Sequence, residues 1–420
     1  MTAVQEPAKT VAEIRATRGM RSKLIFFGPA FVAAIAYVDP GNFATNFSAG
    51  AQYGYLLLWV IIGANLLAML IQTLSAKLGM ATGRNLPEMC QERFPKTVSR
   101  LMWVQAELVA IATDLAEVIG GAIALNLLFG IPLFTGGVIT GIVAFALLAL
   151  QNRGFRPFEL AIAGLFGVIL LGFLTTVFRI GIDGPDLAAG LIPRFEGTDS
   201  LLLATGILGA TVMPHVIYLH SALTSGRIPA VTADDRRFLM RRQRADVLIG
   251  MGLAGVVNAA MLVISAALFF GSNIPDTDTL EGVHAGLARV LDQPAAFAFA
   301  LALLASGFAS SGVGTYAGQV VMQGFIQRRI PLLLRRLLTL TPALVVLGLG
   351  LDATRALVLS QVVLSFGIPF ALVPLVLITR DRAVMKELVN HKITTAVASV
   401  AAALIIGLNG FLIWQTVTGA

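Results

Sequence analysis

Charged residues and cysteine are both scarce in this chain of 420 residues. Only 13% of the residues are charged, against about 25% in a typical soluble domain, and 57% are hydrophobic. Cys90 is the single cysteine, so an internal disulfide and a cysteine-rich metal site are excluded, and we expect a small buried residue there. The net charge of +7 lies in loops, and so little polar surface does not fit a nucleic acid partner. The sequence has no H-E-x-x-H motif and no evident nucleophile–base pair, which argues against an intramembrane enzyme.

Apolar runs near 20 residues in length are abundant instead. Runs of that length cross a bilayer as helices, so the sequence predicts an all-α polytopic membrane protein. We count eleven spans, at about 24–47, 53–78, 101–129, 132–150, 157–179, 200–224, 245–271, 295–325, 331–350, 355–379 and 393–417. A polar tail, residues 1–23, precedes a single membrane domain, 24–420. A cleaved signal peptide is disfavoured because the first apolar run continues beyond the expected cleavage point.

Basic residues indicate how the spans are oriented. Of the 30 Lys and Arg residues, 26 fall in the tail and in alternate loops on the same side of the membrane, and the other four fall on the opposite side. The positive-inside rule places the richer side in the cytoplasm. The N-terminus is then cytoplasmic and, because the number of spans is odd, the C-terminus lies outside the cell.

The first span contains four residues that do not suit the middle of a membrane helix: Asp39, Pro40, Gly41 and Asn42. A carboxylate is costly in hydrocarbon and usually marks a functional site. Pro40 has no N–H, so the carbonyl of Ala36 loses its helical partner. Asp39 suits the N-cap of a new helix, and Pro40 suits its first turn. We therefore expect two half-helices that meet at a polar break, although a loop between two short segments is an alternative.

A second break of the same kind lies in the sixth span, where Pro214 frees the carbonyl of Ala210. The breaks are five spans apart, and because five is odd, the second copy enters from the opposite side of the membrane. This arrangement predicts an inverted repeat, with copies at about 24–180 and 200–380 and an extra helix at 393–417. Substrates of such transporters bind where the two copies meet. The alternative is a pair of unrelated proline kinks.

The groups that the two breaks offer are those of a cation site. Asp39 supplies a carboxylate, Asn42 an amide oxygen, Ala36 and Ala210 their freed carbonyls, and Met213 a thioether sulfur. Oxygen ligands alone suit Mg2+ or Ca2+, whereas sulfur favours a softer ion such as Mn2+, Fe2+ or Cd2+. A structural zinc site is not expected because Cys and His do not cluster. Packing alone is the alternative role for Met213.

Three carboxylates share one face of the third span: Glu107, Asp114 and Glu117. They cannot all face lipid, and buried carboxylates suit a proton relay. His215 and His220 follow the second break and are able to titrate near neutral pH. They lie about 140° apart on a straight helix, so they need not share one path.

Arginine and amide side chains complete the polar groups of the spans. Arg335 and Arg336 open the ninth span and could pair with acids of the third, so a structural network of salt bridges is the alternative to a relay. The other polar residues, taken singly, are expected to join helices to one another: Asn65, Asn258, Gln361 and Asn409.

The two break motifs together, Asp39-Pro40-Gly41-Asn42 and Met213-Pro214-His215, resemble the Nramp family of proton-coupled divalent-metal transporters. The resemblance runs from about Gly28 to Trp414 and implies the LeuT-like fold. It implies metal binding by Asp39, Asn42, Met213 and the Ala210 carbonyl, with the Ala36 carbonyl and Gln361 joining in some conformations. It also implies a proton route through Asp39, His215, Glu107, Asp114, Glu117 and Arg336.

The sequence is therefore interpreted as a proton-coupled secondary transporter that imports divalent metal ions across the bacterial plasma membrane by alternating access. Mn2+ is the favoured ion, with Fe2+ and Cd2+ also accepted. The expected partners are the metal, protons and the lipid bilayer, with no cofactor and no obligate protein partner. Two rivals remain: a LeuT-like transporter of amino acids, which would not use the Met213 sulfur, and a channel, which would not need paired helix breaks.

Overall fold

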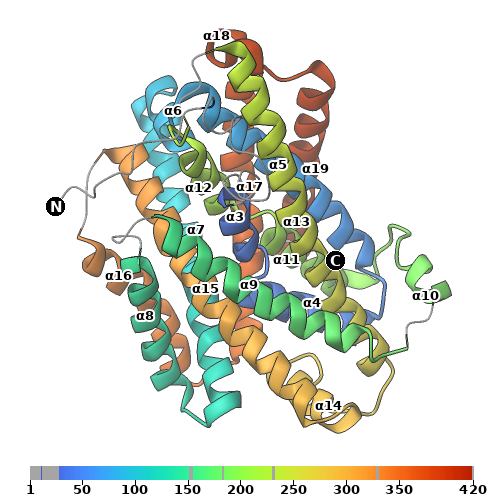
Figure 1. The fold of residues 1–420 in the computed structure, drawn as a ribbon. Helices are drawn as coiled ribbons and strands as arrows, with labels where there is room; N and C mark the ends of the chain where they lie inside the picture. Colours follow the sequence, from blue (N-terminus) through green and yellow to red (C-terminus); the bar gives the residue numbers. More distant parts are fainter. Residues whose placement is uncertain are drawn as a thin grey trace.

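The computed structural model describes residues 11, 28–150, 155–181, 184–228, 232–327 and 331–418. The expected tail, residues 1–23, lies outside these ranges apart from Val11. Within the described ranges every regular element is a helix (Figure 1). Eight helical segments there are long and apolar enough to cross a membrane. The predicted all-α membrane architecture is therefore confirmed.

Each predicted span corresponds to a helix or to a pair of helices. The first span is α3 (Pro29–Ala36) followed by α4 (Pro40–Tyr53), and the sixth is α11 (Gly197–Thr211) followed by α12 (Pro214–Thr224). The unbroken spans are α5 (Leu58–Thr82), α7 (Lys96–Phe129), α8 (Leu133–Leu150), α9 (Phe155–Val177), α13 (Ala233–Phe269), α15 (Gln293–Ile326), α16 (Leu332–Gly348), α17 (Ala353–Thr379) and α19 (Lys392–Thr418).

Within the described residues, short helices occupy four of the connections. They are α6 (Leu86–Arg93), α10 (Gly184–Ala189), α14 (Leu280–Val290) and α18 (Arg382–Met385), the last followed by the 3-10 turn η2 (Lys386–Leu388). Figure 1 shows α6 and α18 at one end of the bundle and α10 and α14 at the other. This placement agrees with a chain that crosses the bundle in alternate directions. Cys90 lies in α6 and is fully buried, as expected.

Both breaks form where proline prevents a continuous helix. Pro40 and Pro214 each occupy the first turn of the second half-helix, where a missing N–H costs nothing. Asp39 caps α4 by accepting a hydrogen bond from the backbone N–H of Asn42. The breaks are therefore real helix ends rather than kinks or an extended loop.

One predicted boundary is wrong by about three turns, at the start of the seventh span. We expected this span at 245–271, but α13 begins at Ala233. Thr232 and Asp235 form a capping box there, and the first turns that follow carry mostly charged residues. Hydropathy marks where a helix enters the apolar layer and does not mark where the helix begins.

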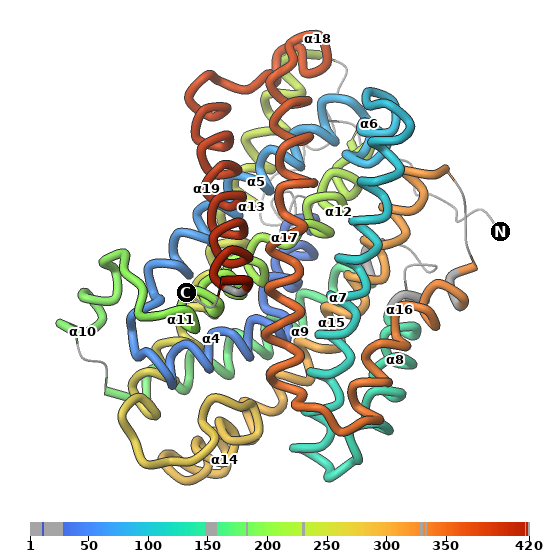
Figure 2. The backbone as a smooth tube through the Cα atoms, turned by 180° about the vertical axis from the view of Figure 1, so that it is seen from behind, coloured from blue at the N-terminus to red at the C-terminus, as the bar shows by residue number. Residues whose placement is uncertain are grey.

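Helix contacts follow the twofold pattern of an inverted repeat. Each helix of one copy can be exchanged for its counterpart in the other copy, five spans away, so that α12 replaces α4 and α5 replaces α13. Helix α4 contacts α13, and the exchanged pair, α12 and α5, is also in contact. The same exchange relates α7–α17 to α15–α9, and α7–α16 to α15–α8, and these contacts also occur. Figures 1 and 2 show α7 and α15 side by side near the middle of the bundle. Helix α19 lies outside the repeat and packs on α17 and α11.

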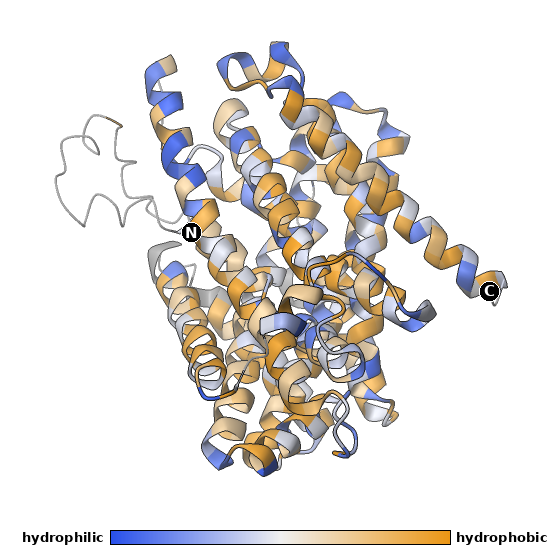
Figure 3. Cartoon of the chain, turned by 90° about the vertical axis from the view of Figure 1, so that its right-hand side faces the viewer, coloured by the Kyte–Doolittle hydropathy of each residue, from blue (hydrophilic) through white to orange (hydrophobic). Residues whose placement is uncertain are grey.

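Small residues let the central helices approach closely. A Cβ built on Gly307 of α15 would lie 2.9 Å from the backbone nitrogen of Gly121 on α7. A Cβ on Gly50 of α4 would lie 2.5 Å from the carbonyl oxygen of Leu262 on α13. Such close contacts are typical of membrane helices, which gain stability from packing rather than from exclusion of water. Large apolar side chains are exposed around the outside, such as Leu404 at 69%, and Figure 3 shows hydrophilic residues concentrated toward the two ends.

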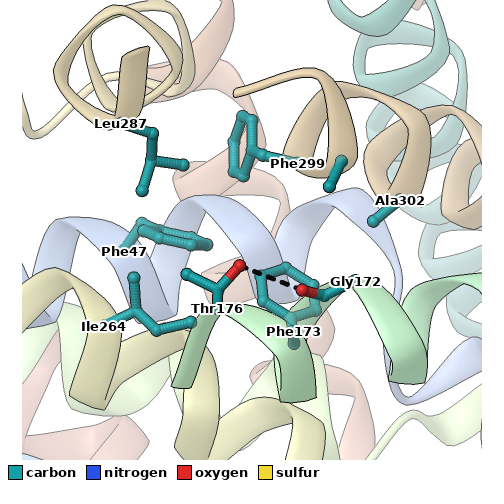
Figure 4. Close-up of a pocket in the computed structure, with 9 residues that line it drawn as sticks. Phe47, Gly172, Phe173, Thr176, Ile264, Leu287, Phe299 and Ala302 are labelled. Atoms are coloured by element: carbon teal, nitrogen blue, oxygen red, sulfur yellow. Dashed lines mark hydrogen bonds between the residues drawn. The ribbon is translucent and has the colours of Figure 1, made fainter. Parts of the chain in front are cut away.

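Aromatic packing fixes the position of α4 against its neighbours. Phe43 meets Phe173 of α9 edge to face at 5.2 Å between ring centroids, and Phe47 meets Phe299 of α15 in the same way at 5.2 Å. A small cavity beside this cluster is lined by Phe47, Phe173, Leu287 and Phe299 among others (Figure 4). Its lining contains no ionisable side chain, so it does not provide the ligands of a cation site.

Candidate metal-binding site

Asp39 and Asn42 form the core of the first break. The carboxylate oxygen Oδ1 of Asp39 accepts hydrogen bonds from the backbone nitrogen of Asn42 at 2.8 Å and from its Nδ2 at 2.9 Å. Both side chains are at most 1% exposed. One carboxylate oxygen is thus held by the helix N-terminus, and the position of the second oxygen, Oδ2, is fixed with it.

A single side chain joins the two breaks. Nδ2 of Asn42 also donates to the carbonyl of Ala210 at 3.0 Å. That carbonyl is the one freed by Pro214, because a proline cannot donate to the residue four positions earlier. The predicted meeting of the two breaks is therefore observed in the fold. Ala36, the other residue with a freed carbonyl, ends α3 three positions before Asp39 and is buried.

Gln361 of α17 reaches the same junction. A Cβ built on Gly41 would collide with the side-chain amide of Gln361, so this amide lies directly against the backbone of the first break. A Cβ on Gly209 of α11 would likewise collide with the Gln361 carbonyl. Glycine at both positions is what allows α17 to approach the two breaks. The sequence suggested a role for Gln361 only through the family resemblance, and the fold brings it to the site.

Four buried oxygens at this junction have no hydrogen-bond partner among the described residues: Asp39 Oδ2, Asn42 Oδ1, Thr211 Oγ1 and Gln361 Oε1. An unpaired buried polar atom costs about 1–3 kcal/mol, and native proteins keep few of them. All four are able to ligate a cation. Their concentration at the two breaks is the strongest sign that this junction binds a metal ion.

Met213 adds the softer group. It forms the N-cap position of α12 with an extended backbone, and its side chain is fully buried. The described residues contain no group of three or more His, Cys, Asp and Glu placed to hold a metal ion. The candidate site thus combines one carboxylate, amide and hydroxyl oxygens and a nearby thioether, a set suited to a divalent ion of intermediate softness.

The backbone of the first break is supported from α13 and α15. Nδ2 of Asn258 donates to the Tyr37 carbonyl at 2.8 Å, and the Ser306 hydroxyl donates to the Val38 carbonyl at 2.6 Å. Asn46 in turn donates to Asn258 at 3.0 Å. These bonds replace helical partners that the break removes. The expected helix-joining role of Asn258 is therefore confirmed, whereas Ser306 carried no signal in the sequence.

The acids of α7 lie beside the first break. A Cβ on Gly120 would collide with the ring of Pro40, which places α7 against the break one turn beyond Glu117. Asp114 forms a buried ion pair with Arg336, which also donates to the hydroxyl of Ser311. The Glu117 carboxyl lies against that of Asp114, and neither of its oxygens accepts from an N–H or hydroxyl donor of the described residues.

Glu107 lies farther along α7 and pairs with the other arginine. Arg335 and Glu107 approach to 3.3 Å, and the Trp103 indole donates to Glu107 at 3.2 Å. The Glu107 side chain is 20% exposed, in contrast to the fully buried Glu117. The three acids therefore run from a partly exposed position to the metal-site junction, and both arginines of α16 face them.

The two histidines of α12 belong to separate networks. Nδ1 of His215 lies 3.2 Å from the hydroxyl of Thr113 on α7, the residue that precedes Asp114. Nδ1 of His220 lies 2.8 Å from Gln72, whose Nε2 donates to the Tyr37 hydroxyl at 2.5 Å. Nε2 of His220 lies 3.2 Å from Nε2 of Gln243, so His220 is placed toward α5 and α13 rather than α7.

Thr211 is the site residue that sequence reasoning missed. It is the last residue of α11, follows Ala210 and is buried. The signal was present, because a hydroxyl beside a helix break in an apolar span is a possible ligand. A threonine in a membrane helix usually bonds to its own backbone, and that competing role concealed it.

The chain is similar to one protein family over nearly all of its length. The family model of Nramp, described as natural resistance-associated macrophage protein-like, matches residues 30–415. Proteins named divalent metal cation transporter MntH from Deinococcus radiodurans and Bacillus subtilis are each 52% identical to it. The first match covers 98% of this chain and 95% of the relative, and the second covers 95% and 94%.

Solved structures show the same similarity in three dimensions. The manganese transporter of Eremococcus coleocola, in complex with an aromatic bis-isothiourea substituted compound, matches with a TM-score of 0.84 and 34% identity. The match covers 94% of this chain and 87% of that one. Mhp1, a nucleobase-cation-symport-1 family transporter, matches at 16% identity with a TM-score of 0.61, over 93% of this chain and 92% of Mhp1. That distant likeness shows the fold alone, and it confirms the LeuT-like architecture.

Proposed function

The chain belongs to the Nramp family, as its two break motifs predicted, and we propose that it imports Mn2+ together with protons across the bacterial plasma membrane. The coarser statement follows from family membership itself: the protein is a multi-pass membrane transporter of divalent metal ions and not an enzyme. The choice of Mn2+, the acceptance of Fe2+ and Cd2+, and the coupling to protons are the proposed parts.

The observation that carries the proposal of a cation substrate is the group of four unpartnered oxygens at the two breaks, within the described residues. Asp39 is the one carboxylate among them and supplies most of the attraction for a dication. Hard oxygens accept Mn2+ but do not reject the more abundant Mg2+ and Ca2+. The Met213 sulfur supports selection of transition metals because a hard ion loses more than a soft one when sulfur replaces a water oxygen.

Alternating access is supported by where the site lies. Residues from α4, α11, α12 and α17 surround it, so it is built from both copies of the repeat. Movement of one copy against the other would open the site to one side of the membrane at a time. In the proposed orientation the N-terminus is cytoplasmic, so α6 and α18 face the cytoplasm and α10 and α14 face outward.

Proton coupling is supported by the acids on α7. Glu117 is buried beside the Asp114 carboxyl with no N–H or hydroxyl donor among the described residues, and Asp114 forms an ion pair with Arg336. We assign the proton route to Asp39, His215, Asp114, Glu117 and Glu107, with Arg336 holding the charge of Asp114. His220 is a second titratable group near the break, on the side of α5 and α13.

Uptake into liposomes tests this function. Purified protein is reconstituted, Mn2+ is added outside under an inward proton gradient, and internal Mn2+ and internal pH are followed together. A proton-coupled importer accumulates Mn2+ above the outside concentration and acidifies the lumen as it does so. Asp39→Asn should abolish both signals, whereas the matched control Asp234→Asn, at a carboxylate that is 82% exposed, should retain them. Uptake that stops at equal concentrations with no pH change would refute the proposal.

A further inference from the structure

Two prolines interrupt the hydrogen bonding of α17, the helix that carries Gln361. Pro369 and Pro374 both lie inside this helix. Because proline has no N–H, each leaves the carbonyl four residues earlier without its helical donor. Those carbonyls belong to Ser365 and Phe370. An unpaired carbonyl in a membrane helix requires a donor from elsewhere.

Each of these carbonyls receives a side-chain donor from a different helix. Nδ2 of Asn409 on α19 donates to the Ser365 carbonyl at 2.9 Å, and the Tyr218 hydroxyl of α12 approaches the Phe370 carbonyl at 3.4 Å. The shorter bond is reinforced, because the Ser365 hydroxyl donates back to Oδ1 of Asn409 at 2.8 Å. Asn409 is 5% exposed and Ser365 is fully buried. Asn409 thus replaces the bond that Pro369 removes.

Ser365 lies one turn beyond Gln361, at the place where α11 packs on α17. A Cβ built on Gly209 would lie 2.8 Å from the backbone nitrogen of Ser365 and would collide with the Gln361 carbonyl. Gly209 immediately precedes Ala210, whose carbonyl bonds to Asn42. Asn409 therefore bonds to the carbonyl of Ser365, the residue whose backbone nitrogen faces the second break.

Apolar contacts place α19 against both helices at this level. Leu412 of α19 packs with Leu201 of α11 and Val362 of α17 in a small cluster separate from the main core. Figure 2 shows α19 running alongside α17. Although α19 lies outside the inverted repeat, it touches the two elements that bring Ala210 and Gln361 to the metal.

We propose that Asn409 is a positioning residue for the metal site. By donating to the Ser365 carbonyl, it fixes the proline-interrupted turn of α17 and, through that turn, the side chain of Gln361 and the second break. The eleventh span would then serve metal binding itself rather than only adding to the bundle. The inference rests on the proposed transport function, which supplies the assay.

A four-variant cycle tests this assignment in the reconstituted full-length protein. The wild type, Asn409→Ala, Pro369→Ala and the double variant are compared for the KM of Mn2+ uptake, the maximal rate and the melting temperature. Asn409→Ala should raise KM about 5- to 10-fold, a change expected when a buried amide–carbonyl bond is lost. In the Pro369→Ala background, the alanine N–H supplies the Ser365 carbonyl, so the same Asn409→Ala change should raise KM less than 2-fold.

Two further variants sharpen the comparison. Asn409→Asp keeps the shape and the acceptor for the Ser365 hydroxyl but loses the donor, so it should raise KM at least as much as Asn409→Ala. Gln415→Ala, on the same helix, removes a polar side chain that bonds to the exposed hydroxyl of Thr198 and should leave KM unchanged.

Three results would overturn the positioning role. The first is a normal KM in Asn409→Asp, and the second is an equal effect of Asn409→Ala with and without Pro369. The third is a lower melting temperature with unchanged KM, which would show that Asn409 only attaches α19 to the bundle. A wild-type protein that takes up no Mn2+ would instead refute the proposed function, and this inference with it.

Discussion

Replacing Asp114 by asparagine tests the buried ion pair that joins α7 to α16. The side chains of Arg336 and Asp114 are 2% and 5% exposed, so neither charge is solvated by bulk water. Asparagine keeps the shape of aspartate but removes its charge. Arg336 then keeps two hydrogen-bond acceptors, the new amide oxygen and the Ser311 hydroxyl, but loses the negative charge of Asp114.

The size of the effect follows from this burial. Removing one partner of a buried pair costs up to about 3–5 kcal/mol of folding free energy when the remaining charge has no other countercharge. The Glu117 carboxyl also interacts electrostatically with Arg336, so this figure is the upper limit for Asp114→Asn. The exposed pair of Arg84 and Glu92, with side chains 54% and 53% exposed, gives a matched control. Glu92→Gln should cost less than about 1 kcal/mol because solvent screens a surface pair.

Two assays separate the structural role of Asp114 from its role in transport. Equilibrium unfolding in detergent compares Asp114→Asn with Glu92→Gln and gives the loss of stability. Uptake of Mn2+ with and without a proton gradient gives the coupling, and calorimetry gives the metal affinity. We expect the proton gradient to lose its effect on the uptake rate in Asp114→Asn, while the Kd for Mn2+ changes less than 3-fold.

Two results would refute this reasoning. Equal stability losses in Asp114→Asn and Glu92→Gln would mean that water reaches the Asp114–Arg336 pair. Loss of Mn2+ affinity as severe as that caused by Asp39→Ala would assign Asp114 to the metal site and not to the proton route.

Three further substitutions probe the metal site directly. Asp39→Ala should abolish Mn2+ binding in calorimetry, while size-exclusion chromatography should show that the protein remains folded. Mn2+ binding equal to that of the wild type would refute the assignment of Asp39 as a metal ligand. Met213→Ala should admit Ca2+ as a competitor and weaken Cd2+ binding more than Mn2+ binding, with about 1–2 kcal/mol corresponding to roughly 5- to 30-fold in relative Kd; a uniform loss for all ions in a competition assay would mean that Met213 only packs. Gly41→Ala should displace Gln361, because the added Cβ would collide with its amide, and raise the KM for Mn2+ several-fold; an unchanged KM would show that Gln361 does not contribute to the site.

The helix breaks could be read from the sequence because their chemistry is local. Pro40 and Pro214 each remove a backbone donor and suit the first turn of a new helix, and Asp39 caps the helix that follows the first break. The spacing of the breaks then predicted the inverted repeat and the meeting of the two breaks, which the hydrogen bond from Asn42 to Ala210 bears out. Each of these conclusions needed only backbone hydrogen bonding and the direction of successive spans.

Other parts of the site depend on contacts between distant segments and could not be predicted in this way. The Ser306 hydroxyl supports the Val38 carbonyl from 268 positions away, and one serine in an apolar helix resembles any other. Asn409 was expected to join helices, but its partner could not be named until α19 was placed beside α17. The early start of α13 was hidden because charged turns outside the membrane carry no hydropathy signal.

Anomalous X-ray diffraction at the manganese absorption edge, from crystals grown with Mn2+, tests the central claim most directly. We predict one strong peak at the junction of the two breaks, within bonding distance of Asp39 Oδ2 and Asn42 Oδ1 and beside the sulfur of Met213. A strong peak at Asp114 and Glu117, or an absence of density at the breaks when Mn2+ saturates transport, would contradict it.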